Sequence, residues 1–225
     1  MSLKEKVSLM IDIETLGTAT DAVILSIGIV PFEPKPDGEI YESKGRQIFV
    51  TPDSQKSRSV TTGTVGWWLR QSSDAQKRMA NGMDRAVSLT YALEMLDTAP
   101  MYFFNCHRDY HPLSSTDENR GWNRIDQVWA NGTTFDISNL ATAYESQGRV
   151  PIWAKDGGFR KVRCQRTLTG ALGDVEQDLL RLNVSQWAEE RTMKLVPHDA
   201  VDDCIYQCKV IQEANRLLRQ YREPA

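Results

Sequence analysis

The stretch MIDIETLG, residues 10–17, combines the pattern of a buried strand with two acidic side chains. Apolar residues alternate up to and through it, at Val7, Leu9, Ile11 and Ile13. This period of two predicts a strand over residues 7–13 with one face in a core. Asp12 and Glu14 share the other face, about 7 Å apart at the backbone, because a strand rises about 3.3 Å per residue. Like charges that close repel, so the pair suggests a cation site, although a strand end in solvent explains it equally well.

The composition is that of an ordinary globular domain. The chain has 225 residues, of which 40% are hydrophobic and 25% are charged, with a formal net charge of −3. This size predicts one domain over residues 1–225, and the lack of a basic excess counts mildly against a protein that coats nucleic acid. No apolar run approaches the roughly 20 residues of a membrane helix, and the N-terminus lacks signal-peptide features. We therefore expect a cytoplasmic protein with no membrane contact.

The four cysteines are too few and too scattered to predict a disulfide scaffold. Cys204 and Cys208 lie one helical turn apart in an apolar stripe, which favours core packing over a metal site. Cys106 has His107 and His111 nearby, but no fourth ligand is close in sequence, so a solvated loop is the better interpretation. The pattern predicts reduced thiols, as in a cytoplasmic protein.

Strand and helix patterns along the chain suggest one α/β domain around a mixed sheet. Predicted strands cover residues 7–13, 22–32, 45–50, 126–130 and 159–165. Predicted helices cover residues 64–79, 84–96, 135–147 and 168–180, followed by a last helix from about residue 199. The first three strands are expected to form an antiparallel meander. The polar segment 105–121 predicts a long loop excursion within the same domain.

Two later stretches add acids at the starts of predicted helices. NGTTFD, residues 131–136, places Asp136 in a first helical turn, where the helix dipole alone explains an acid. HDAVDD, residues 198–203, begins with His198 and carries three aspartates into the last helix. Each stretch alone is weak evidence for a functional site.

The three acidic stretches together resemble the motifs of the DEDDh (DnaQ-like) 3′–5′ exonucleases. That family has an Asp-x-Glu pair, a second Asp at a helix start, and a His followed five residues later by an Asp. Carried over position by position, the resemblance implies a catalytic set of Asp12, Glu14, Asp136, His198 and Asp203. A finer resemblance, through TVGWWLRQSSDAQKRM at 64–79, is to the phage exonuclease A (DexA-like) branch. One departure is Asn131–Gly132, where many members have His-Asn, and it leaves the contacts of the terminal nucleotide open.

The resemblance implies a ribonuclease H-like mixed five-stranded sheet flanked by helices, with the acids at one end. Four carboxylates in one pocket call for divalent cations, and oxygen ligands suit two Mg²⁺ or Mn²⁺ ions. The implied metal ligands are Asp12, Glu14, Asp136 and Asp203. Two ions activate water and stabilise the leaving oxygen in phosphodiester hydrolysis, and His198 would be the general base.

Helical periodicity does not choose between Asp202 and Asp203, because the two flank the apolar stripe of the last helix at similar angles. The resemblance chooses Asp203, because the family places its final Asp five residues after the His. Asp202 is then expected to be a solvated acid on the helix surface.

Substrate contacts follow from the same resemblance. It implies that the terminal nucleotide meets Thr15, Leu16, Gly17 and Phe135. Core packing is the alternative for Leu16 and Phe135. A helix can bury only one of two adjacent tryptophans fully, so we expect Trp67 or Trp68 to pack and the other to be free to stack on a base.

Arg163 and Arg166 are candidate phosphate contacts. The expected partner is the free 3′ end of single-stranded DNA, with release of 5′-mononucleotides. An exoribonuclease of the RNase T or oligoribonuclease type is an open alternative, because nothing in the sequence reads the 2′-hydroxyl. A catalytically silent nucleic-acid-binding module on the same fold is a third interpretation, and the intact acid set argues against it. The sequence also leaves open a homo-oligomer.

Overall fold

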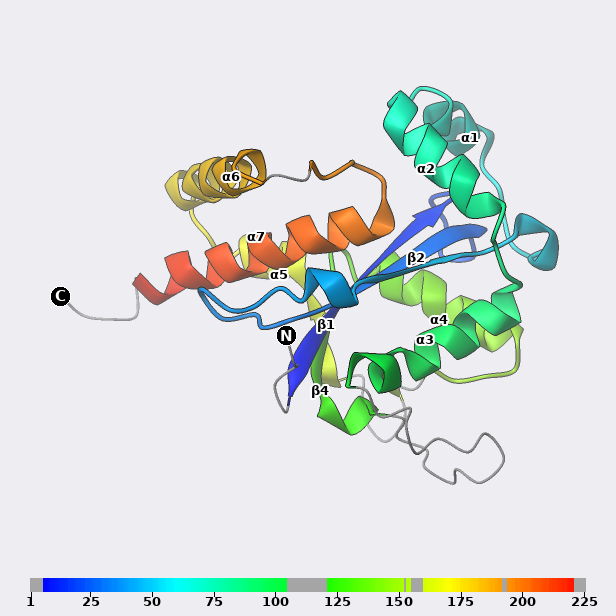
Figure 1. Ribbon diagram of the computed structural model, residues 1–225, viewed down its shortest axis with the longest axis horizontal. Helices are drawn as coiled ribbons and strands as arrows, with labels where there is room; N and C mark the ends of the chain where they lie inside the picture. Colours follow the sequence, from blue (N-terminus) through cyan, green and yellow to red (C-terminus); the bar gives the residue numbers. More distant parts are fainter. Residues whose placement is uncertain (1–5, 105–120, 152, 155–159, 192–193, 221–225) are drawn as a thin grey trace.

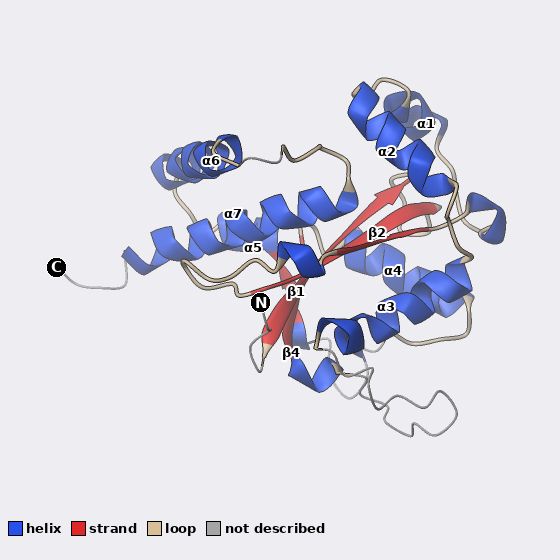
Figure 2. Ribbon diagram, in the orientation of Figure 1, coloured by secondary structure: helices blue, strands red, loops and turns tan. Residues whose placement is uncertain are grey.

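The computed structural model describes residues 6–104, 121–151, 153–154, 160–191 and 194–220. A five-stranded sheet with the order β3-β2-β1-β4-β5 forms its centre (Figure 2). The strands are β1 (Val7–Thr15), β2 (Ile24–Phe32), β3 (Arg46–Phe49), β4 (Ile125–Ala130) and β5 (Val162–Cys164). β1, β2 and β3 pair antiparallel, whereas β4 is parallel to β1 and β5 is parallel to β4. The predicted α/β fold with a ribonuclease H-like mixed sheet is confirmed.

Helices cover both faces of the sheet (Figure 1). The odd-numbered apolar side chains of β1 pack in one core with α3 (Leu89–Phe103) and α4 (Asp136–Ser146). Met10 packs in a second core on the opposite face, under α7 (Ala200–Gln220). Cys204 and Cys208 are fully buried in that second core, which confirms the prediction of core packing. Since Asp12 and Glu14 alternate with the first set, they point toward the α7 face.

Gly28 allows α7 to begin directly on the sheet. It lies in β2 opposite Asp12 in the antiparallel register. A methyl group at Gly28 would overlap the backbone carbonyl of Ala200, the first residue of α7. The close approach brings the first turn of α7 beside the carboxyl-terminal half of β1, which is where two of the predicted acidic motifs meet.

Arg58 anchors α4 to the sheet on the other face. Its guanidinium donates to the carbonyl oxygens of Ala22 and Asn139, at 3.0 and 3.1 Å. It also donates to the side-chain oxygen of Asn139. This network ties α4, which carries Asp136 in its first turn, to the chain entering β2.

The predicted helix over residues 64–79 is wrong in one respect, because two helices replace it. These are α1 (Thr62–Trp68) and α2 (Ser73–Met83). The Ser72 hydroxyl accepts from the backbone N–H of Ala75 and caps α2. The Gln76 amide donates back to the carbonyls of Trp68, Leu69 and Gln71, and so closes the end of α1. Local side-chain capping therefore competes with a continuous helix here.

Two other helices also differ from their predicted bounds. The helix predicted at 84–96 is α3, which begins after its cap Ser88 and continues through Pro100. The helix predicted at 168–180 is instead α5 (Gln165–Thr169) followed by α6 (Asp174–Glu189). Gly170 follows the last residue of α5, and Gly173 is the N-cap of α6, a position where glycine is tolerated well.

Shorter elements complete the description. Among the described residues, short 3-10 helices include η1 (Glu42–Lys44), η2 (Pro52–Ser54) and η4 (Trp122–Arg124). The predicted excursion 105–121, with Cys106, His107 and His111, lies outside the described residues except for Gly121. Within the described ranges, every helix is too short or too polar to cross a membrane.

Candidate active site

The two acidic side chains of β1 are buried. Asp12 and Glu14 are each 8% exposed. Burial raises the pKa of Asp12 well above its usual range, and the charges of Asp136 and Asp203 raise it further. Burial also raises the pKa of Glu14, followed by the charges of Asp12, Asp203 and Asp136. The four carboxylates therefore converge closely enough for each to oppose the ionisation of the β1 pair.

Asp136 enters the site from the first turn of α4. Its carboxylate accepts a hydrogen bond of 3.1 Å from the backbone N–H of Gly132. Burial raises the pKa of Asp136 to about 6, while backbone hydrogen bonds and the positive charge of Arg166 act in the opposite direction. Arg166 is solvent-exposed and lies beside Gly132, so it places a cation next to the acidic centre.

A strained turn holds the histidine and the last aspartate. His198 has a φ of 66°, in the left-handed region that non-glycine residues seldom adopt. Its backbone N–H donates to the carboxylate of Asp203 at 3.0 Å. Asp199 caps α7 by accepting from the backbone N–H of Asp202. Burial raises the pKa of Asp203 to about 6.

Glu14, His198 and Asp203 each offer one ligand atom, and these atoms all lie within 4.8 Å of one another. The closeness of these atoms and the raised pKa values of the carboxylates fit a divalent cation, which would relieve the repulsion. A set rich in carboxylate oxygens suits Mg²⁺ or Mn²⁺. Asp12 and Asp136 lie outside this tight group of three, and their charges act on the same carboxylates.

The His198 side chain lies beside the acidic side chains of Glu14 and Asp203 and contacts Trp67. Its ring meets the ring of Trp67 edge-on, with 4.6 Å between centroids. Burial lowers the pKa of His198, which favours the neutral imidazole at neutral pH. A neutral imidazole can accept a proton, as a general base must.

The burial of Asp202 differs from what the sequence predicted. This residue is 9% exposed, whereas the sequence predicted a solvated surface acid. The carboxylate accepts from the backbone N–H of Val196 and from the Arg78 guanidinium, each at 2.8 Å. Arg78 comes from α2 and also pairs with Asp199 at 3.3 Å. Asp202 therefore braces the turn before α7 against α2, and the close group of Glu14, His198 and Asp203 does not include it.

Gln207 is a site residue that the sequence analysis missed. Its side-chain amide donates to the carboxylate of Asp12 at 2.8 Å, from a position that is 6% exposed. This contact fixes one oxygen of Asp12 and leaves the other oxygen for a different partner. The signal was present in the spacing, because Gln207 follows Asp203 by four residues and so shares its face of α7.

A pocket of about 430 Å³ opens beside Glu14. Its wall includes Thr15, Gly17, Phe135 and Trp67. The Thr15 hydroxyl donates to the Gly17 carbonyl at 2.7 Å, which fixes the turn after β1. Leu16 is absent from the lining, and its backbone N–H and C=O bond to Val23 and Thr61.

The tryptophan pair divides as predicted. Trp68 is buried, and its indole N–H donates to the Thr15 carbonyl at 2.9 Å. Trp67 is half-buried, lines the pocket and touches His198. Phe135 lines the pocket and also packs against the core beneath α4.

The two candidate phosphate contacts differ in position. Arg166 lies near Asp136, as described above. Arg163 is the middle residue of β5, and its guanidinium donates to the main-chain carbonyls of Arg160 and Val162.

Comparison with known proteins gives three findings. A family model described as a 3′–5′ exoribonuclease Rv2179c-like domain matches residues 7–215. The exodeoxyribonuclease of Enterobacteria phage T4 is 34% identical over 136 residues, which cover 58% of this chain and 52% of the phage protein. The crystal structure of cell-death related nuclease 4 is similar with a TM-score of 0.52 at 13% identity, covering 96% of this chain and 64% of that chain. The chain thus spans about half the length of the phage relative, and its likeness to the solved structure concerns the fold alone.

Proposed function

The chain belongs to the family of 3′–5′ exoribonuclease Rv2179c-like domains, and we propose that it is a metal-dependent 3′–5′ exonuclease. It removes 5′-mononucleotides from the free 3′ end of single-stranded nucleic acid, as a single domain over residues 1–225. The observation that carries this proposal is the convergence of three buried carboxylates, the half-buried Asp203 and His198 beside an open pocket. The resemblance to the DEDDh motifs, and the finer resemblance to the DexA-like branch, support the same assignment.

Asp12, Glu14, Asp136 and Asp203 would hold the metal, with Mg²⁺ or Mn²⁺ as the ions. Two such ions, when bound, activate a water and stabilise the leaving oxygen of an in-line displacement at phosphorus. Gln207 orients Asp12 through its 2.8 Å hydrogen bond. The backbone hydrogen bonds from Gly132 and His198 orient Asp136 and Asp203 in the same way.

His198 takes the proton of the attacking water. Burial keeps its imidazole neutral, and its neighbours Glu14 and Asp203 place it at the acidic centre. Trp67 limits the orientation of the ring by an edge contact. A positioned base of this kind contributes about 10²–10⁴-fold to rate.

The pocket beside Glu14, which we name the terminal pocket, receives the last nucleotide of the strand. Its lining includes Thr15, Gly17 and Phe135, three of the four residues that the family resemblance suggests for this role. Trp67 adds an aromatic surface on which a base can stack. Leu16 does not line this pocket, and it supports the turn through its backbone hydrogen bonds.

The proposed substrate is DNA, with RNA as a second candidate. The 34% identity over 136 residues with the exodeoxyribonuclease of phage T4 supports DNA. The family description favours RNA.

The free thiols of Cys204 and Cys208 support a cytoplasmic setting.

Gel analysis of 5′-labelled DNA and RNA oligomers tests this function. With Mg²⁺ we expect a ladder that shortens from the 3′ end, and we expect no change in excess EDTA or with a blocked 3′ end. Degradation that continues in EDTA, or that starts at the 5′ end, would contradict the proposal. Binding without hydrolysis would indicate the silent module instead.

A further inference from the structure

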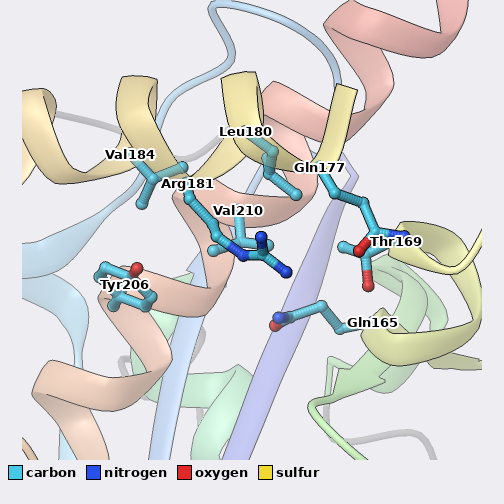
Figure 3. A pocket seen from close by; sticks show the side chains of 8 residues that line it. All are labelled: Gln165, Thr169, Gln177, Leu180, Arg181, Val184, Tyr206 and Val210. Atoms are coloured by element: carbon cyan, nitrogen blue, oxygen red, sulfur yellow. The ribbon is translucent and has the colours of Figure 1, made fainter. Parts of the chain in front are cut away.

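A second pocket, of about 190 Å³, lies where α5, α6 and α7 meet (Figure 3). We name it the α5–α7 pocket. Gln165 lines it from α5, Arg181 from α6 and Tyr206 from α7. The proposed hydrolysis uses none of these three side chains.

The Gln165 amide oxygen has no hydrogen-bond partner within the part of the chain that the structure describes. Gln165 is 9% exposed, and this oxygen is buried. The amide reaches toward the middle of the pocket, where the Arg181 guanidinium arrives from the opposite wall (Figure 3). A buried amide oxygen without a partner is unfavourable, so a ligand or ordered water that pairs with it is stabilised.

The remaining wall favours a flat, partly apolar ligand. Leu180, Val184 and Val210 form its apolar part. The Tyr206 side chain is 39% exposed and presents its ring at the pocket edge. Arg181 is held by an ion pair of 2.8 Å with Asp178. An aromatic ring, a guanidinium and an amide beside an apolar wall match the face and the polar edge of a nucleobase, and Gln pairs with adenine through two hydrogen bonds.

The α5–α7 pocket continues the proposed active site along α7. Tyr206 follows Asp203 by three residues, about 4.5 Å further along the helix axis. On the opposite wall, Arg166 follows Gln165 directly and lies beside Gly132, near Asp136. The terminal pocket is lined by Glu14 and β1 residues instead. Glu14 thus borders the terminal pocket, and Asp203 lies about one helical turn from Tyr206 of the α5–α7 pocket.

We propose that the α5–α7 pocket binds a base of the substrate strand on the 5′ side of the scissile phosphate. The proposal rests on the proposed function, because that function places the 3′-terminal nucleotide in the terminal pocket. A strand with its last nucleotide there and its scissile phosphate at the acids continues toward α7. The Gln165 amide then pairs with the edge of an upstream base, while Tyr206 stacks on its face.

Single abasic substitutions test this proposal. A series of oligomers carries one abasic residue at the second, third, fourth or fifth position from the 3′ end, and kcat/KM is measured for each. We expect one position to lower kcat/KM by about tenfold in the wild type, the usual worth of one stacked base. The same abasic residue should have no further effect in Gln165→Leu or Tyr206→Ala.

The control variants are Gln186→Leu, an exposed glutamine on α6, and Tyr91→Ala, a tyrosine on α3 that is 54% exposed. Both should keep the abasic effect of the wild type. A wild type that hydrolyses from the 3′ end without any position-dependent abasic effect would overturn the pocket assignment and leave the exonuclease intact.

Photo-crosslinking gives a reading that does not depend on turnover. Oligomers with 5-iodouracil at each position are irradiated with the protein in EDTA, and the crosslinked peptide is identified by mass spectrometry. We expect an upstream position, and not the terminal one, to label the peptide that contains Tyr206. If Tyr206 is labelled but the protein shows no hydrolysis, the pocket proposal is supported and the exonuclease proposal is contradicted. If no position labels the protein, the pocket proposal is contradicted.

A free nucleotide shares the chemistry of a base in a strand, so calorimetry with AMP and dAMP separates the two. Weak or absent binding is expected, because the strand supplies most contacts. Tight binding of a free mononucleotide that Gln165→Leu removes, combined with no abasic effect, would overturn the strand proposal in favour of a nucleotide-binding pocket.

Discussion

β1 and the turn before α7 deliver acids to the same place by different means. Asp12 and Glu14 belong to a central strand whose nine residues are all buried, and its ladders with β2 and β4 fix their direction. His198 and Asp203 depend on a left-handed backbone, a side-chain cap and the Arg78 pair. One half of the site is therefore set by regular structure, and the other half by a few individual side chains.

The comparison shows where the site is tolerant and where it is fragile. A substitution at Asp12 or Glu14 changes a ligand without moving β1, because the strand is held by its backbone. A substitution in the turn before α7 can change a ligand, move another ligand, or do both. Variants that separate these effects test whether the two regions differ in this way.

The largest expected effect is at Asp203. Asp203→Asn should lose nearly all activity at any Mg²⁺ concentration, because a carboxylate is removed from the centre. Its neighbour Asp202 is the matched control, since Asp202→Asn retains an oxygen that accepts from Val196 and loses only charge toward the partly exposed Arg78. Asp202→Asn should stay within several-fold of the wild type in activity assays. A dead Asp202→Asn beside an active Asp203→Asn would reverse the assignment.

Replacement of His198 should have the next largest effect. His198→Ala should slow turnover by about 10²–10⁴-fold, the usual worth of a positioned base. His198→Asn is a second variant, because asparagine tolerates the left-handed φ of 66° and so separates loss of the imidazole from backbone strain. Mn²⁺ binding measured by calorimetry should survive in both. If binding is abolished, His198 acts as a ligand beside Glu14 and Asp203.

Gly28→Ala tests how closely the two regions must approach. The added methyl group overlaps the backbone of Ala200 and must push α7 away from β1. A displacement of about 1 Å at a reacting centre lowers activity by about 10²-fold. Gly66→Ala is the control, because its methyl group meets only the tip of the Arg70 side chain, at 3.5 Å. Equal activity of the two variants would show that α7 adjusts without consequence.

The smallest expected effect is the pH dependence of stability without metal. Burial raises the folded-state pKa of Asp136 and Asp203 to about 6, above the value of about 3.9 in an unfolded chain. The folded state thus binds protons more tightly, so this stabilisation is present at low pH and is lost as pH rises from about 4 through about 6. In EDTA, Tm should fall by a few degrees between about pH 5 and pH 7. Mg²⁺ should abolish that fall, and a rise in Tm over the range would contradict the account.

The sequence could predict the half of the site that rests on regular structure. A period of two is enough to place Asp12 and Glu14 on one face of β1. The buried state of Asp202 could not be predicted, because its partner Arg78 lies 124 residues away and comes close only through the packing of α2. The break between α1 and α2 depends on Gln76. Its place in the sequence suggests one continuous helix, but its amide donates to carbonyls at the end of α1 and closes that helix.

Contacts between distant segments explain the other omissions. Gln207 reaches Asp12 across 195 residues, and the α5–α7 pocket forms only when α6 packs on α7. The family resemblance chose Asp203 where helical periodicity left two aspartates open. Periodicity describes single elements, whereas these features depend on pairs of elements.

A calorimetric titration with Mn²⁺ tests most directly whether β1 and α7 build one metal centre. The wild type, Asp12→Asn and Asp203→Asn are compared at pH 7. We predict that the wild type binds two ions and that each substitution weakens the same binding events, because both acids serve one centre. Two ions bound with unchanged affinity in either variant would contradict the account.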